Sequence, residues 1–142
     1  ERLGGPDEAD AQNHNPAAAL FGASAREMVR LVTLLGGNPA MVTSLPGVGD
    51  QYVTCAGGRS IRLGRLLGKG LTYEQARAEM AGETLESAFV VEQIAKALSG
   101  LEARGLIGHD ELPLTRCLCR AVAGNAPANI DFDRLFPDDA TQ

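Results

Sequence analysis

Apolar residues recur at the spacing of an α-helix along two long segments of this chain, and the alternation typical of β-strands is almost absent. The first segment follows Asn15 and Pro16, a pair that predicts a helix start, and it ends at Gly36. The second segment runs from about Leu85 to Ala103. The pattern predicts an all-α fold of seven or eight helices, and 142 residues suffice for one domain with a real core.

Turn and cap signals divide the rest of the chain into shorter helices. Thr72 and Gln75 have the T-x-x-Q spacing of a capping box, so a helix is expected to begin just after Thr72. Asp110 is expected to cap a later helix that holds Pro113 in its first turn and runs to about residue 123. The other expected helices are short and cover residues 38–44, 50–55, 61–67 and 131–135.

Charge and aromatic content argue against several classes of function. The chain has a formal net charge of -5, only 4% aromatic residues and no Trp, which argues against nucleic acid as a partner. No apolar run approaches the roughly 18 residues of a membrane span, so no membrane partner is expected. All but two of the 13 basic residues are arginine, whose planar fork suits a bidentate grip on carboxylate or phosphate.

The cysteines and histidines lack the spacing of a metal site. The three cysteines are an odd number, which disfavours a disulfide framework and favours a reducing cytoplasm as the location. His14 and His109 lie far from the cysteines in sequence, so no metal ligand set is expected.

The most site-like stretch is LPGVGDQYVTCAGGRSIRLG, residues 45–64. Asp50 and Thr54 are four residues apart, so on a helix they share one face. Arg59 follows two glycines at an expected helix start, where backbone N–H groups, the helix dipole and a guanidinium would converge on an anion. These residues therefore predict an anion site.

Ordinary structural roles are open for the same residues. Asp50 could be a helix N-cap, and Arg59 a solvated side chain after a helix end. Glu83 and Glu86 flank the start of the second long helix, where a capping role is expected for Glu83. The residues 64–70, GRLLGKG, lack the Ser or Thr that a phosphate-binding P-loop needs. From the residues alone, both the site and the structural role remain possible.

Several motifs together resemble the NAD(P)-dependent glycerol-3-phosphate dehydrogenase family. The resemblance is carried first by the central stretch, which is quite specific, and then by the segments NPAAALFGASAREMVRLVTLLGGNP, LTYEQARAEMAGETLESAFVVEQIAKAL and ELPLTRCLCRAVAGNAPANIDFDRLF. The similarity covers about residues 15–136. Residues 1–14 are then a polar lead-in from a preceding domain and residues 137–142 a tail.

The resemblance implies a fold and a reaction. The chain would be the all-helical C-terminal domain of a two-domain enzyme, of the 6-phosphogluconate-dehydrogenase-like type, serving substrate binding and dimerisation in a homodimer. An N-terminal Rossmann domain, not present in this sequence, would bind NAD or NADP. The family moves a hydride between NAD(P)H and dihydroxyacetone phosphate, which gives sn-glycerol 3-phosphate, so the partners would be a phosphorylated three-carbon substrate and the cofactor.

The resemblance also implies roles for individual residues. Asp50 matches the catalytic aspartate, which orients the essential lysine and the reacting oxygen; that lysine is expected upstream of Glu1. Thr54 and Asn15 match residues of the substrate pocket. This chain alone is therefore expected to be inactive.

The turn at Gly58, Arg59 and Ser60 matches the family's grip on the substrate phosphate. Arg59 would be the main clamp of that anion and would also touch the cofactor, and Glu86 matches a glutamate near the cofactor ribose. Ser60 stands where the family has asparagine, so a hydroxyl replaces an amide donor.

Two further departures remove positive charge. Ala17 and Ala23 stand where the family has a lysine and an arginine. These departures leave two alternatives open: a diverged, non-catalytic helical module that binds an anionic metabolite or mediates dimerisation, or another oxidoreductase on the same architecture. The cofactor preference between NAD and NADP is not encoded in this part.

Overall fold

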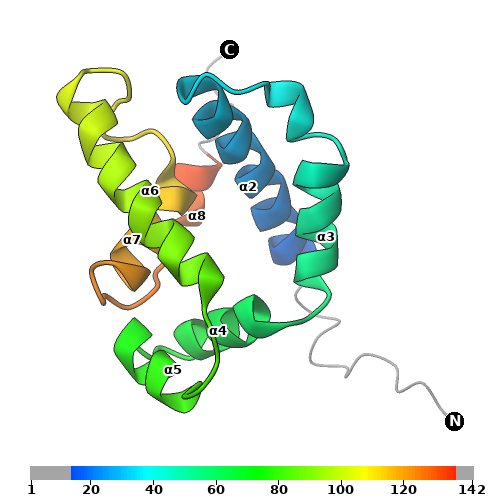
Figure 1. The fold of residues 1–142 in the computed structure, drawn as a ribbon, viewed down its shortest axis with the longest axis vertical. Coiled ribbons are helices and arrows are strands. Elements are labelled where there is room, and N and C mark those ends of the chain that lie inside the picture. Colours follow the sequence, from blue (N-terminus) through cyan, green and yellow to red (C-terminus); the bar gives the residue numbers. More distant parts are fainter. Residues whose placement is uncertain (1–13, 137–142) are drawn as a thin grey trace, which may run out of the picture.

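The computed structural model describes residues 14–136, and in that range every regular element is a helix. Two long helices, α2 (His14–Leu34) and α6 (Glu86–Ala103), stand on opposite sides of the molecule (Figure 1). Between them lie α7 (Pro113–Val122) and the short α8 (Phe132–Leu135). The predicted all-α fold is confirmed.

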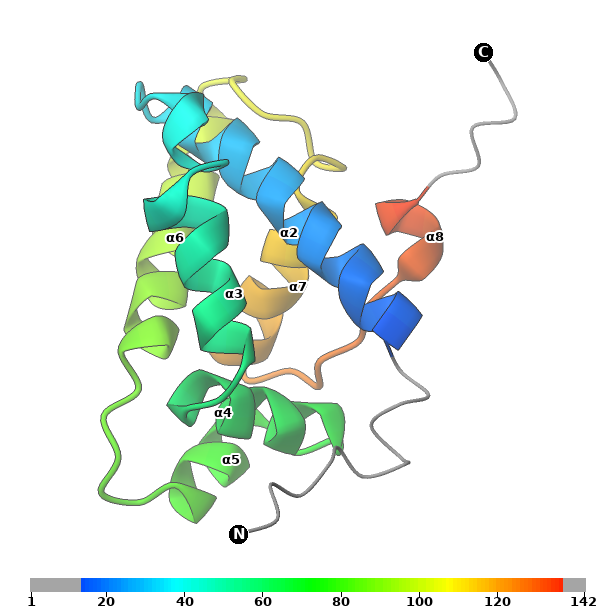
Figure 2. The ribbon, with the colours of Figure 1, turned by 90° about the vertical axis from the view of Figure 1, so that its right-hand side faces the viewer.

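A chain of short helices links the two long ones. A 3₁₀ turn η1 (Pro39–Met41) and a π-helical turn η2 (Leu45–Gly49) lead into α3 (Asp50–Cys55), which runs beside α2 (Figures 1 and 2). The helices α4 (Arg59–Gly68) and α5 (Tyr73–Glu79) then form one end of the molecule. The expected short helices are thus present, with boundaries shifted by a few residues.

The core consists of two separate apolar clusters. One joins α4, α5, the start of α6 and the end of α7, and its buried residues are Leu63, Leu67, Ala76, Met80, Ala88 and Val122. The other joins the C-terminal half of α6 to the loop before α7, through Leu98, Leu101, Ile107 and Leu112, and Leu31 and Leu34 of α2 pack against it. Each long helix therefore packs part of its apolar face into the core, whereas Leu35, just after α2, and Val90 of α6 are exposed.

Local cap signals are confirmed where the partners are near in sequence. The Thr72 side chain accepts from the Gln75 amide, and the Gln75 side chain accepts from the Thr72 amide at 2.9 Å, which completes the predicted capping box. The Asn38 side chain caps η1 by accepting from the Ala40 amide at 3.0 Å. Asn15 and Pro16 are the predicted N-cap and first helical residue of the long first helix, but His14 is already helical, two residues earlier, so Asn15 lies within the helix and is not its N-cap.

Two other predicted caps are wrong. Asp110 does not cap α7, because its carboxylate pairs with Arg134 of α8, and Leu112 occupies the N-cap position with a left-handed backbone at φ 61°. Glu83 does not cap α6, because its carboxylate is paired with Arg62 of α4. In both cases the carboxylate forms an ion pair with an arginine of a helix other than the one it was expected to cap.

Instead of Asp110, the carboxylate of Glu27 caps the N-terminus of α7 from α2. Its oxygens accept from the Leu114 amide at 2.8 Å and from the Thr115 amide at 2.7 Å, and the Thr115 hydroxyl donates to it at 2.6 Å. Glu27 is buried, with 8% of its surface exposed. Because three donors satisfy the carboxylate, its burial fixes α7 against α2.

An exposed ion pair makes part of this packing depend on pH. Arg30 of α2 donates to Glu111 at 2.8 Å, and Glu111 also accepts from the Gly108 amide at 2.8 Å. The bond from Arg30 is the main cause that lowers the Glu111 pKa below its ordinary value of 4.5. Folding stability from Glu111 is therefore present above that value and is lost as the pH falls through the lowered pKa of the folded state.

We expect the Glu111→Gln variant to lose this acid dependence. Its free energy of unfolding should be lower than that of the parent at pH 7, and the difference should shrink as the pH falls through the lowered Glu111 pKa, because the carboxyl group is then protonated in both the folded and the unfolded state. Urea unfolding followed by circular dichroism at several pH values measures this. A Glu74→Gln variant, which changes an exposed glutamate on α5, is the control. A difference that stays constant with pH would contradict the role of the pair.

Candidate functional site

The predicted site residues gather mainly around the turn between α3 and α4. The π-helical turn η2 runs directly into α3, and the amide of Asp50 donates to the carbonyls of both Leu45 and Gly47. Asp50 is therefore a residue of the first helical turn, with no side-chain N-cap bond, and the structural role considered for it is not found. Since α3 is helical throughout, Asp50 and Thr54 lie on one face, and both are exposed.

The close contact between Gly47 of η2 and the backbone of Val42 requires a glycine. A Cβ built on Gly47 would lie 2.0 Å from the carbonyl oxygen of Val42, a distance at which backbone atoms collide. The same carbonyl accepts the Val48 amide at 2.7 Å. The glycine therefore allows two backbone segments to pack directly, just before α3 begins.

The turn after α3 has the features of an anion site. Gly58 is the N-cap of α4 with φ 106°, and no side chain caps the helix there. The first bond within α4 runs from the Arg62 amide to the Gly58 carbonyl, so the amides of residues 59–61 have no partner within the helix. Arg59 is exposed at the first position of α4 and forms no ion pair with another residue of the described range.

Ser60 joins this turn to the start of α6. Its hydroxyl donates to the Ser87 hydroxyl at 3.1 Å, and Ser87 follows Glu86, the first residue of α6. The structure thereby brings the start of α6 to the Arg59 turn, and Glu86 is exposed there. The serine at the position of the family's asparagine is thus engaged in joining two helix starts.

The structure does not bring every predicted site residue to this turn. Asn15 is exposed in the first turn of α2, and Figure 2 shows that this end of α2 stands apart from the α3–α4 turn. Ala23 is completely buried on α2, whereas Ala17 is exposed. The two positions where the family has a cation therefore differ in exposure. Only a cation at position 17 would lie at the surface of this domain.

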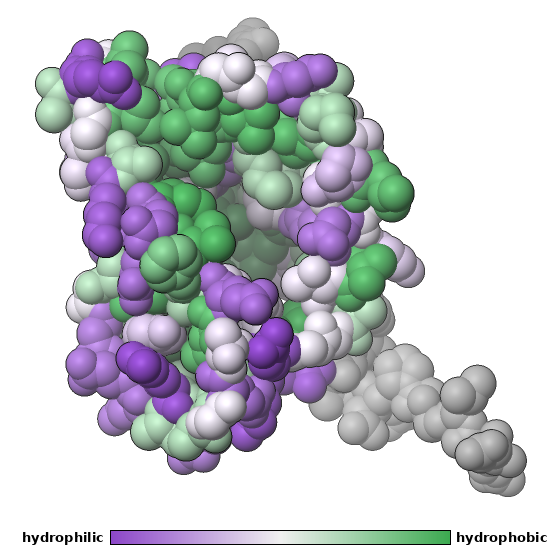
Figure 3. Space-filling model, viewed as in Figure 1, coloured by the Kyte–Doolittle hydropathy of each residue, from purple (hydrophilic) through white to green (hydrophobic). Residues whose placement is uncertain are grey.

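An apolar groove lies between the two long helices. Figure 3 shows a hollow between α6 and the α2–α3 side, with hydrophobic surface inside it and on its α6 side. The associated cavity of about 260 Å³ is lined mostly by apolar side chains, among them Met28, Leu31, Val91, Ile94 and Leu118. Gln51 of α3 reaches it, and its Oε1 atom is buried with no hydrogen-bond donor among the described residues, while its Nε2 contacts the Ser24 hydroxyl. The groove cannot be predicted from the sequence, because helical periodicity does not distinguish apolar residues packed in a core from apolar residues that line a cavity.

None of the helices in residues 14–136 is both long and apolar enough to cross a membrane. Within the same range, no group of three or more His, Cys, Asp or Glu side chains is placed to hold a metal ion.

The comparisons with known proteins agree with the fold and the central motif. The family model described as the NAD-dependent glycerol-3-phosphate dehydrogenase C-terminus matches residues 5–130. The chain therefore belongs to this family of C-terminal, helical oxidoreductase domains.

Curated relatives carry the name glycerol-3-phosphate dehydrogenase [NAD(P)+]. The protein from Trichlorobacter lovleyi is 35% identical over 119 residues, which cover 81% of this chain and 33% of the relative. The protein from Macrococcus caseolyticus is 33% identical over 129 residues, covering 89% of this chain and 36% of the relative. This chain thus spans about a third of the length of these relatives. No solved structure shows significant similarity to it.

Proposed function

We propose that this chain is the substrate-binding part of an NAD(P)-dependent glycerol-3-phosphate dehydrogenase, which transfers a hydride between NAD(P)H and dihydroxyacetone phosphate. The observation that carries the proposal is the open N-terminus of α4, where Gly58 and Arg59 follow the helix of Asp50 and Thr54. Membership of the C-terminal dehydrogenase family supports it.

The Arg59 turn is suited to a phosphate group. The unpartnered amides at the start of α4 and the guanidinium of Arg59 can donate to phosphate oxygens, and the helix dipole favours negative charge there. The absence of a side chain on Gly58 leaves the backbone accessible. Holding the phosphate fixes a three-carbon substrate in position, which lowers the entropic cost of the reaction.

Asp50 and Thr54 would act at the other end of the substrate. Reduction of a ketone places negative charge on its oxygen, and a cationic donor stabilises that charge. We assign to Asp50 the orientation of a lysine from the preceding domain, and to Thr54 a hydrogen bond in the same pocket. The exposure of both side chains on one face of α3 supports a role toward another domain or a ligand.

The cofactor would be held mainly by the preceding Rossmann domain, and when bound it supplies the hydride. From this chain, Arg59 and Glu86 fit a contact to it. They are exposed charged residues at the starts of α4 and α6, and the Ser60–Ser87 bond joins those two starts. A guanidinium can donate to phosphate and a carboxylate can accept from ribose hydroxyls. The active protein would be a homodimer in the cytoplasm.

A steady-state assay of the full-length protein tests the proposal. We expect oxidation of NADH or NADPH that depends on dihydroxyacetone phosphate, and no turnover by residues 1–142 alone.

Titration calorimetry with cofactor and substrate, run beside the assay, identifies the second candidate. That candidate is a non-catalytic module, favoured by the loss of cations at Ala17 and Ala23. Binding without turnover would establish it and contradict the enzyme, whereas turnover with another hydroxy acid or phosphate would identify a different oxidoreductase.

A further inference from the structure

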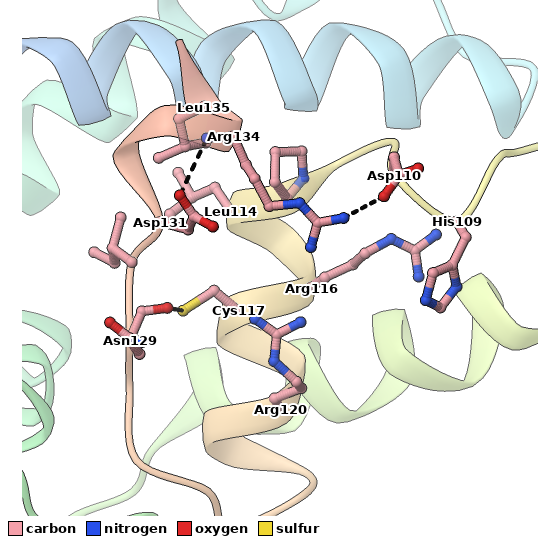
Figure 4. Close-up of a pocket in the computed structure, with 12 residues that line it drawn as sticks. His109, Asp110, Leu114, Arg116, Cys117, Arg120, Asn129, Asp131, Arg134 and Leu135 are labelled. Atoms are coloured by element: carbon pink, nitrogen blue, oxygen red, sulfur yellow. Dashed lines mark hydrogen bonds and ion pairs between the residues drawn. The ribbon is translucent and has the colours of Figure 1, made fainter. Parts of the chain in front are cut away.

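A second cluster of arginines lies far along the chain from the Arg59 turn. Arg116 and Arg120 come from α7 and Arg134 from α8, and Figure 4 shows their side chains on the same side of α7, with the Arg116 guanidinium next to His109. These four residues line a cavity of about 220 Å³ between α7 and α8. They also line an adjoining cavity of about 290 Å³ on the side of α6. We call this arrangement the arginine pocket.

Arg116 is held rigidly at the centre of the arginine pocket. Its Nε donates to the Glu111 carbonyl at 2.7 Å, its Nη2 donates to the Gly108 carbonyl at 3.0 Å, and its Nη1 lies 2.6 Å from Glu102 Oε1. Only 15% of its side chain is exposed. A guanidinium fixed in this way pays little further entropy when it meets a ligand.

The acidic groups around the pocket are already engaged. Glu102 is paired with Arg116 and Asp110 with Arg134. Asp131, the remaining carboxylate in the lining, caps α8 by accepting from the Arg134 amide at 3.2 Å. Two of the three guanidinium groups therefore have a carboxylate partner, and the third, that of Arg120, has none among the described residues.

Arg120 is the third guanidinium, and it is exposed with no hydrogen bond or ion pair to any residue in the range 14–136. It lies one helical turn after Arg116, and like charges at this spacing repel each other. Both guanidinium groups also act on the nearby Cys119, where they oppose the rise that burial causes in the thiol pKa. Asp110 accounts for the position of Arg134 and Glu102 for that of Arg116, so Arg120 is the arginine of this cluster whose charge no carboxylate of the described residues pairs with.

We propose that the arginine pocket binds a small phosphate-type oxyanion, at a site separate from the Arg59 turn and independent of the proposed dehydrogenase function. The ligand bridges Arg120 to the guanidinium groups of Arg116 and Arg134 and supplies the negative partner that Arg120 lacks among the described residues. Arginine forks match the geometry of phosphate oxygens. A volume of about 220 Å³ is smaller than the roughly 300–1,000 Å³ of pockets for larger ligands, so a phosphate group fits the space better than a nucleotide.

The test is a calorimetric titration of inorganic phosphate into the full-length protein, in chloride buffer of constant ionic strength. All samples carry Arg59→Gln, which removes the other candidate anion site. We expect one phosphate to bind, and we expect Arg120→Gln to weaken its binding by about tenfold, the effect of losing one charge-assisted hydrogen bond. Arg65→Gln is the matched control, because Arg65 is also an exposed arginine in the last turn of a helix, α4, and it should have no effect.

Nuclear magnetic resonance locates the binding independently of the variants' folding. Phosphate should shift the amide signals of residues 116–120 and 134. No binding to the Arg59→Gln protein, equal weakening by Arg120→Gln and Arg65→Gln, or shifts confined to another surface would each overturn the proposal. Methyl phosphate in place of inorganic phosphate identifies the source of the group: equal affinity indicates a phosphomonoester site, and a preference for inorganic phosphate indicates the free ion.

Discussion

Replacing Arg59 with glutamine should lower kcat/KM for dihydroxyacetone phosphate by about 100- to 10,000-fold in the full-length protein. A bidentate grip on phosphate comprises two charge-assisted hydrogen bonds of roughly 1.5–3 kcal/mol each, and each 1.36 kcal/mol is a factor of ten in rate. Arg59 is the natural clamp because it is exposed at an uncapped helix start with no ion pair inside the described range. A steady-state assay measures the change.

Two controls separate this role from a general loss of structure. Arg65→Gln, on the same helix, should leave the rate unchanged. With dihydroxyacetone, which lacks the phosphate, and with the cofactor at saturating concentration, so that a lost cofactor contact does not affect the rate, the parent and Arg59→Gln should differ by less than about threefold. If Arg59→Gln retained full kcat/KM for the phosphorylated substrate, Arg59 would not be its anion clamp.

The second large effect is on stability. Replacing Glu27 with alanine should reduce the free energy of unfolding by about 3–5 kcal/mol, because the change leaves two α7 amides and the Thr115 hydroxyl without their acceptor. Urea unfolding followed by circular dichroism measures this, since the chain has no Trp.

Thr115→Val is the matched control for Glu27→Ala. It removes one of the three donors and leaves the carboxylate with both amides, so it should cost only about 1 kcal/mol. A loss below about 1 kcal/mol in Glu27→Ala would show that water replaces the carboxylate and that the cap is not what holds α7 on α2.

The sequence predicts those parts of the fold whose causes are local. Helical periodicity, Gly and Pro positions and the Thr72–Gln75 capping box correctly indicate an all-α chain and most of its helices. The start of α4 at Arg59 follows from the two preceding glycines, since Gly58 adopts a left-handed backbone that other residues avoid. The start of α4 is also the centre of the candidate site, so the position of the Arg59 turn could be predicted from the residues of the turn itself.

The errors arise where a partner lies far away in sequence. Asp110 has every local property of a cap for α7, yet its carboxylate forms an ion pair with Arg134. The cap is supplied by Glu27, which lies 87 residues before Leu114. The carboxylate of Glu83 likewise forms an ion pair with Arg62 and does not cap α6. The arginine pocket escaped notice for the same reason, because only the i, i+4 spacing of Arg116 and Arg120 is visible in sequence, and Arg134 joins them through the fold.

The packing at Gly47 has a consequence for how this chain can vary. A methyl group at that position would overlap the Val42 backbone at 2.0 Å, and because the three nearest atoms are all main-chain atoms of Val42, no flexible side chain can move aside. In a library of random substitutions, position 47 should accept glycine alone. The neighbouring exposed positions Leu45 and Val53, which meet no such obstacle, should accept many residues. Glycine in this stretch therefore restricts sequence variation more strongly than a buried leucine would, although it is the smallest residue.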